Sequence, residues 1–191
     1  DTVVLATVVS KKLVNDPGYF PLSVEYVEKH YAGGRITPQK FIKREGRPSE
    51  KSILSGRAID RSIRPLFPRD YRAEVQVIIT VLSFDAINDP AMVGFIGASA
   101  ALSMSSVPWN GPIGVVRVAE SEGQLVINAD MEDRALMNLD LTVAASATKI
   151  VMVEAEAKQV ADDVMYAAME KGFEANQPII ALINDFVKEA G

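Results

Sequence analysis

The residues with the clearest chemical potential in this chain are cations gathered in one segment. Between Arg35 and Arg72 the chain places eleven of its 20 Lys and Arg residues and only four acids, so this segment carries a formal charge of +7 while the whole chain carries −5. The eleven cations are Arg35, Lys40, Lys43, Arg44, Arg47, Lys51, Arg57, Arg61, Arg64, Arg69 and Arg72. Because a guanidinium donates two parallel hydrogen bonds to a phosphate, this Arg-rich segment predicts an anionic partner.

Within that segment, two apolar residues directly precede two cations. Phe41 and Ile42 stand before Lys43 and Arg44, in a stretch without a clear helical or strand period. This order suits a single strand of nucleic acid, because a base can contact the apolar group while its phosphate contacts the cation.

Two other interpretations of the charge remain open. The segment could be a solvated face of the molecule, as most charge runs are. Alternatively, Arg57, Arg61 and Arg64, which fall at helical spacing on one side of a predicted helix, could pair with Asp60 and with glutamates inside a subunit interface.

A second group of candidate residues is acidic. These acids are Asp130, Glu132, Asp133, Asp140, Glu154 and Glu156. Carboxylates could hold Mg²⁺ through their oxygens, but the spacing does not show that these converge, and surface acids are common. We therefore predict no metal site from them.

Other catalytic patterns are absent from the sequence. His30 is the only histidine and no nucleophile-elbow pattern accompanies it, so a Ser-His-Asp arrangement is not expected. There is neither a Walker-type phosphate loop nor a dinucleotide fingerprint. Trp109, in a proline-flanked turn, is expected to fill core space.

The composition is that of a globular chain. The 191 residues are 48% apolar and 24% charged and include no cysteine, which excludes disulfides and suits a reducing compartment. The longest uncharged stretch, 90–116, is interrupted by prolines and glycine, so we expect buried core there and no membrane span. The chain opens without Met and ends on Glu189-Ala190-Gly191, so we expect a piece of a longer polypeptide.

The strands that must position these residues follow from β-branched runs and turn signals. We expect strands at 2–10, 20–28, 74–83, 113–119, 124–128, 139–145 and 150–155. The turn signal in 15–18 predicts an antiparallel hairpin of the first two strands. Glu122-Gly123 and Ala147-Thr148 predict hairpins for the last two pairs.

The helices follow from capping residues and periodicity. We expect helices at 50–64, 92–105, 158–171 and 177–190. Ser49 should cap the first helix and Pro65 should end it, while Gly172 marks a break between the last two. The second helix is rich in small residues, which let a helix approach a sheet closely. Mixed β-sheets built from hairpins, packed with helices and followed by a helical tail, define the α+β class.

One long motif resembles a known family. Residues Phe41 to Pro68, FIKREGRPSEKSILSGRAIDRSIRPLFP, resemble the first RNase PH-like core domain of the bacterial polynucleotide phosphorylases, and the resemblance extends over nearly the whole chain. It implies an RNase PH-like domain over 1–157 whose N-terminal strand region is missing. It also implies that 158–191 are C-terminal helices of the same domain, leading toward an all-helical linker domain.

The family implies a ring-shaped homotrimer that degrades RNA from the 3′ end. Inorganic phosphate attacks the terminal phosphodiester, assisted by Mg²⁺, and releases a nucleoside diphosphate in a reversible reaction. The implied partners are single-stranded RNA in a central channel, the other subunits, a second RNase PH-like domain of the same polypeptide and proteins of RNA-degradation complexes. No membrane is implied, and the implied location is the cytoplasm.

The resemblance implies a narrower part for this segment. In the family the chemistry belongs to the second domain, whose serine-rich phosphate loop corresponds to about 88–91 here, where Asp89 supplies an acid and no hydroxyl is present. Asp140 corresponds to one carboxylate of the active domain, while Met137-Asn138 leave the other without a counterpart. We therefore expect no catalytic residue, no bound Mg²⁺ or phosphate, and no phosphorolysis from this segment alone.

The family's channel loop contacts RNA through two aromatic and then two basic residues. The resemblance maps that loop onto Phe41, Ile42, Lys43 and Arg44, which are the expected RNA-binding residues. Ile42 departs from the pattern and offers apolar contact where an aromatic would stack, so Phe41 should matter more. Lys43 keeps the charge but not the fork of an arginine.

Two alternatives to RNA contact follow. The segment could be a purely structural, trimer-forming module whose Arg residues are buried in salt bridges, with Arg47, Arg57, Arg61 and Arg64 supporting the active domain or an interdomain contact. It could also be an active single-domain phosphorolytic ribonuclease, which the missing serine-rich loop disfavours.

Overall fold

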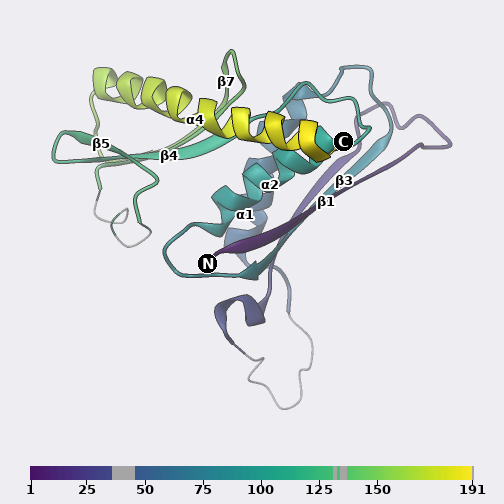
Figure 1. Cartoon of the computed structure of the whole chain (residues 1–191), viewed down its shortest axis with the longest axis horizontal. Coiled ribbons are helices and arrows are strands. Elements are labelled where there is room, and N and C mark those ends of the chain that lie inside the picture. The colour runs from purple at the N-terminus through teal and green to yellow at the C-terminus, as the bar shows by residue number, and fades with distance from the viewer. Residues whose placement is uncertain (36–45, 131–132, 134–136, 191) are drawn as a thin grey trace. The chain divides into compact units, whose positions relative to one another are not determined.

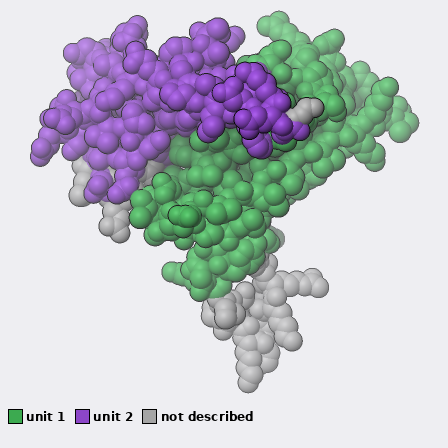
Figure 2. All heavy atoms as spheres, in the orientation of Figure 1, with its two compact units in different colours: residues 1–110 green, residues 111–191 purple. Residues whose placement is uncertain are grey.

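A computed structural model describes residues 1–35, 46–130, 133 and 137–190 of the chain. The chain forms two compact units, residues 1–110 (unit 1) and 111–191 (unit 2), which Figure 2 colours separately. Both units combine a β-sheet with helices, so the α+β class is confirmed (Figure 1).

The sheet of unit 1 has three strands in an order that differs from the prediction. Its strands are β1 (Val3–Lys11), β2 (Leu22–Glu28) and β3 (Glu74–Ser83). Because β3 lies between the other two, antiparallel to β1 and parallel to β2, the predicted hairpin of the first two strands is wrong.

The physical reason for this difference is non-local. The predicted turn does form locally, since the carboxylate of Asp16 accepts the backbone N–H of Gly18 at 2.8 Å. However, β3 is the most thoroughly buried strand of this sheet, with four alternate residues at most 2% exposed, and it takes the centre. Those four residues are Val75, Val77, Ile79 and Val81.

Two helices, α1 (Glu50–Ile63) and α2 (Pro90–Met104), cover one face of this sheet. The glycines of α2 explain the close approach. A Cβ on Gly94 would lie 3.0 Å from the side chain of Ile79, and one on Gly97 would lie 3.2 Å from the Cβ of Ala6. The expectation that small residues bring this helix close to a sheet is therefore confirmed.

The opposite face of the same sheet is open along β1. Val3, Leu5 and Val9 point to that face and are 45%, 50% and 60% exposed. A row of exposed aliphatic side chains on a strand is a feature of surfaces that bind other proteins.

The sheet of unit 2 has four strands in the order β5-β4-β6-β7. They are β4 (Gly114–Ser121), β5 (Gln124–Ile127), β6 (Leu139–Ala145) and β7 (Ile150–Ala157). Both predicted hairpins are confirmed, with β4 antiparallel to β5 and β6 antiparallel to β7.

A single helix, α4 (Asp162–Ala190), packs on β4 and β6 of this sheet, so the predicted break at Gly172 is wrong. Gly172 serves close packing instead, because a Cβ there would lie 2.7 Å from a methyl of Val143. Ala168, Gly172 and Asn176 form the buried stripe of the helix at a spacing of four residues. The continuation of this helix toward a linker domain stays a prediction.

Among the described residues, no helix combines enough length with enough apolar character to cross a membrane.

Candidate nucleic-acid interface

The start of α1 is fixed to the end of β2 by serine hydroxyls. The Oγ of Ser49 accepts the backbone N–H of Ser52 at 3.0 Å, which confirms the predicted cap. The hydroxyls of Ser49 and Ser52 both donate to the carboxylate of Glu28, at 3.2 and 3.1 Å. These bonds set where the basic helix begins relative to the sheet.

A cavity of about 460 Å³, which we call the root cavity, opens at this junction. Arg35 and Arg47 both line it, although twelve positions separate them in the chain. The other lining residues are Tyr26, Val27, Glu28, Lys29, His30, Gly33, Gly46, Pro48, Ser49 and Ser52. The lining therefore combines three basic side chains with one carboxylate, whose Oε2 already accepts two hydroxyls.

A second cavity of about 370 Å³ continues from the root cavity between β2 and α1. The two share Tyr26, Val27, Pro48 and Ser52, and the second is also lined by Arg57 and Arg64. Burial first, and then the charges of Glu28 and Asp89, raise the pKa of the Tyr26 hydroxyl well above its ordinary value, so Tyr26 stays neutral.

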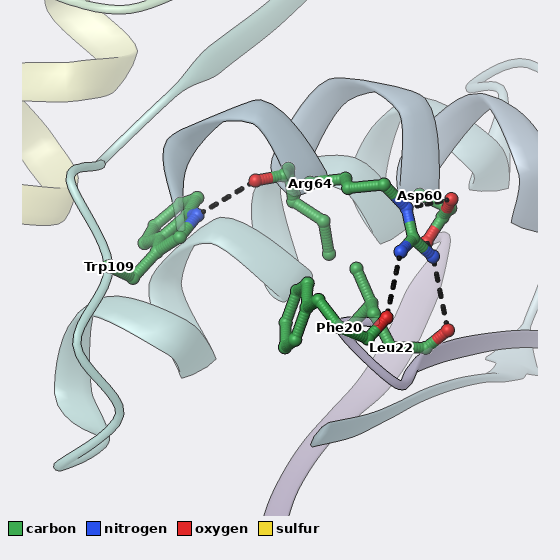
Figure 3. Close-up of polar contacts among 6 residues, drawn as sticks. Phe20, Leu22, Asp60, Arg64 and Trp109 are labelled. Atoms are coloured by element: carbon green, nitrogen blue, oxygen red, sulfur yellow. Dashed lines mark hydrogen bonds and ion pairs between the residues drawn. The ribbon is translucent and has the colours of Figure 1, made fainter. Parts of the chain in front are cut away.

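Arg64 forms hydrogen bonds and an ion pair with other residues of unit 1 (Figure 3). Its guanidinium forms a two-point contact with Asp60, at 2.9 and 2.7 Å, and donates to the backbone carbonyls of Phe20 and Leu22 at 3.3 and 3.1 Å. It also lies over the ring of Phe20, 5.7 Å from the centroid. Arg64 thus ties the entry of β2 to the end of α1.

A cluster of aromatic rings packs beside the same junction between β2 and the end of α1. The ring of Phe67 lies 4.7 Å from that of Phe20 and 6.4 Å from that of Trp109. The indole N–H of Trp109 donates to the carbonyl of Ile63 at 3.1 Å, as Figure 3 shows. Trp109 is half-buried and not part of the fully buried core, but its bond to Ile63 and its contact with Phe67 make it a structural residue.

The three cations at helical spacing differ in their surroundings. Arg64 pairs with Asp60, as one sequence interpretation proposed. Arg57 is exposed, and no ion pair to it occurs within the described part of the chain. Arg61 is exposed but has a polar or ionic partner. Helical spacing alone therefore does not show that these three arginines share a role.

The segment 88–91, which the resemblance maps onto a phosphate loop, contains the cap of a helix. Asp89 is the N-cap of α2, and its carboxylate accepts the backbone N–H of Ala91 at 3.0 Å. A helix N-terminus attracts anions through its free N–H groups and dipole. Here an internal carboxylate already fills that position, and phosphate does not fit.

The candidate metal-binding acid is paired with a cation. Asp140 lies on β6, and its carboxylate accepts a hydrogen bond from the guanidinium of Arg117 on β4 at 2.7 Å. Among the described residues, no group of three or more His, Cys, Asp or Glu side chains could hold a metal ion. Since Arg117 supplies positive charge where a cation would bind, Mg²⁺ does not fit Asp140 here.

The four predicted RNA-binding residues, Phe41, Ile42, Lys43 and Arg44, lie outside the described residues. The structure brings together Arg35 and Arg47, which flank them in the chain. Lys29 and His30, which also line the root cavity, were missed as candidates. Their only signal in the sequence is their position just before Gly33-Gly34, ahead of the basic segment.

Comparison with family models matches both units in turn. Residues 1–108 match the model of the 3′ exoribonuclease family, domain 1, and residues 111–175 match that of the 3′ exoribonuclease family, domain 2. The border between the two matches coincides with the border between units 1 and 2. The chain belongs to the 3′ exoribonuclease family of RNase PH-like proteins.

Two individual relatives are similar to this chain over its whole length. The chain is 50% identical over its whole length to a polyribonucleotide nucleotidyltransferase of Rhodospirillum centenum, and 47% identical to one of Roseiflexus sp.. It spans 27% and 26% of those two proteins, or about a quarter of the length of the curated relatives it matches.

A solved structure supports the fold alone. The crystal structure of rice (Oryza sativa) Rrp46 superposes with a TM-score of 0.72 over 98% of this chain and 83% of that one, at 12% sequence identity. The RNase PH-like fold expected from the sequence is therefore confirmed.

Proposed function

We propose that this chain is the first RNase PH-like core domain of a polyribonucleotide nucleotidyltransferase, a phosphorolytic 3′-to-5′ exoribonuclease of the cytoplasm. The observation that carries the proposal is the match at about 50% identity, over the whole chain, to proteins of that name. Within that enzyme, this domain contacts single-stranded RNA and takes part in a homotrimer. The second RNase PH-like domain supplies the chemistry, with Mg²⁺ and inorganic phosphate.

The RNA-contacting part of the proposal has two supports. The basic segment carries eleven cations, and its described flanks gather Lys29, Arg35 and Arg47 around one cavity. Phosphate contacts of this kind supply most of the sequence-independent affinity for nucleic acid. The residues that contact RNA most directly are Phe41, Lys43 and Arg44, with Ile42 adding apolar contact.

A double variant tests this part. Lys43→Ala with Arg44→Ala should weaken the binding of a labelled single-stranded RNA, measured by fluorescence anisotropy. Arg69→Ala is the control, since Arg69 is an exposed cation of the same segment. Affinity equal to that of the wild type in the double variant would count against RNA contact by this loop.

The proposed lack of catalytic activity in this domain depends on Asp89 and Asp140. Asp89 fills the anion position at the N-terminus of α2, and Arg117 neutralises Asp140. Incubated with RNA, phosphate and Mg²⁺, the 191-residue chain should release no nucleoside diphosphate. Phosphorolysis that disappears in Asp140→Asn would show that the domain is itself active.

The exposed face of β1 favours a second function, assembly. Val3, Leu5 and Val9 offer an aliphatic strip that another RNase PH-like domain could cover. Leu5→Glu should then lower the oligomeric state seen by native mass spectrometry, while Val14→Glu, at a residue 99% exposed outside that strip, should not. If both variants assemble as the wild type does, this face is not the interface.

A further inference from the structure

We propose that Tyr31 and the root cavity form a further RNA contact, in which the cavity receives a backbone phosphate and Tyr31 stacks on a neighbouring base. The inference rests on the proposed RNA binding. It assigns a role to described residues that lie outside the expected channel loop.

Tyr31 is an exposed aromatic side chain beside a cluster of cations. It is 56% exposed and lies on the short 3₁₀ helix η1 (His30–Gly33). In a 3₁₀ helix, residues three apart lie on the same side. Because His30 and Gly33 line the root cavity, Tyr31 stands next to the cavity and its ring can remain outside it.

The backbone beneath Tyr31 is held firmly. Ala32 is only 8% exposed, and its carbonyl accepts the backbone N–H of Phe84, just beyond β3, at 3.0 Å. Gly34 ends the 3₁₀ helix in the left-handed conformation, with a φ of 68°, and its N–H donates to the carbonyl of Tyr31 at 3.0 Å. A backbone that is already ordered loses little further entropy when a base stacks on the side chain that it carries.

The root cavity supplies the matching electrostatics. Lys29, Arg35 and Arg47 line it together with a single carboxylate, that of Glu28, whose Oε2 accepts the hydroxyls of Ser49 and Ser52, so basic side chains outnumber acidic ones. An aromatic face next to a cationic cavity suits the two chemical parts of a nucleotide, the base and the phosphate. An acidic peptide would need the cations but not the aromatic ring.

The experiment compares two polyanions, a labelled oligoadenylate and a polyphosphate that lacks bases. Tyr31→Ala should weaken oligoadenylate binding roughly tenfold and leave polyphosphate binding unchanged, because stacking acts on the base alone. Tyr31→Phe should keep the affinity of the wild type. Arg47→Ala should weaken both ligands.

Tyr166→Ala is the matched control. Tyr166 is 64% exposed, but its helical neighbours are the acids Asp162, Asp163 and Glu170. Replacing it should therefore leave the affinity for RNA unchanged. If Tyr31→Ala binds oligoadenylate like the wild type, or weakens both polyanions equally, the stacking contact is refuted. If the wild type binds no RNA at all, the proposed function fails together with this inference, whereas RNA binding that depends on Lys43 and Arg44 but not on Tyr31 overturns this inference alone.

Discussion

The guanidinium of Arg64 donates hydrogen bonds to the carboxylate of Asp60 and to the backbone carbonyls of Phe20 and Leu22. Arg57, one helical turn before Asp60, is exposed, and no ion pair to it occurs among the described residues. At the scale of single residues, the cations of the basic segment therefore differ: Arg64 is bonded within the fold, whereas Arg57 is exposed. The distinction depends on which carbonyls and carboxylates lie within reach.

The role of Arg64 leads to the first prediction. Arg64→Lys keeps the charge but loses the planar fork, so the free energy of unfolding should fall by about 1 kcal/mol, since the side chain is partly exposed. RNA affinity should stay close to that of the wild type. Urea denaturation and RNA titration of Arg64→Lys and of the control Arg69→Lys would check both effects, and a loss of RNA affinity without a loss of stability would contradict the structural role.

Asp85 gives the second residue-scale prediction. Hydrogen bonds from Asn88 first, and then from Ile87 and Thr2, hold the pKa of this carboxyl well below its ordinary value of 3.8. A lowered folded-state pKa stabilises the protein above the unfolded-state pKa, and this stability is lost as the pH falls toward the folded-state value.

Replacing the titrating group should remove that part of the pH dependence. In Asp85→Asn the difference in melting temperature between pH 6 and pH 2 should be smaller than in the wild type. Asp70→Asn, at an exposed acid, is the control. Equal differences in the wild type and in Asp85→Asn would show that this carboxyl does not contribute.

At the scale of elements, α4 shows how packing overrides local signals. Gly and Pro inside a helix cost about 1 and 3 kcal/mol relative to Ala, yet α4 runs through both Gly172 and Pro178. The side-chain amides of Asn176 and Gln177 donate to the carbonyls of Gly172 and Phe173, at 2.9 and 3.1 Å. Burial of the stripe on β4 and β6 then keeps the helix continuous.

Gly172 therefore carries the element-scale prediction. In Gly172→Ala the new methyl would lie 2.7 Å from Val143, and overpacking of this kind costs about 1–3 kcal/mol, although alanine favours the helix. Thermal denaturation should show a clear loss of stability. Gly46→Ala, where a Cβ would meet nothing within 4 Å, is the control. A rise in melting temperature for Gly172→Ala would mean that the glycine is not needed for packing.

Local chemistry explains which elements the sequence predicts well. Ser49 caps α1 through its own side chain, and Glu122-Gly123 lies between two adjacent strands, so both features are visible in a few residues. The position of β3 between β1 and β2 is different, because it depends on a strand some fifty residues away. No turn signal contains that information.

The candidate interface also has parts that the sequence predicts and parts that only the fold reveals. The basic segment is evident from charge alone, and its match to a family motif points to RNA. The root cavity is not evident, because Lys29, Arg35 and Arg47 come from separate stretches that only the fold brings together. Likewise, the pairing of Arg117 with Asp140 joins β4 to β6, and the sequence gives no sign of it.

At the scale of the whole molecule, the proposed RNA contacts and the candidate acid Asp140 belong to different units. The basic segment and the root cavity lie in unit 1, whereas the neutralised Asp140 lies in unit 2. In unit 1 the anion position of α2 is filled by Asp89. Asp89 and the Arg117–Asp140 pair are therefore the residues on which the proposed lack of catalysis by this domain depends.

The most direct test of this account is the salt dependence of RNA binding. For the wild type, the logarithm of the association constant should fall linearly with the logarithm of the salt concentration, because phosphate contacts release counterions. In the Lys43→Ala, Arg44→Ala double variant the slope should become shallower by about 1.4, which corresponds to two lost contacts with a single strand. Identical slopes for the two proteins, or no RNA binding by the wild type, would contradict the central claim that this domain contacts RNA through its basic loop.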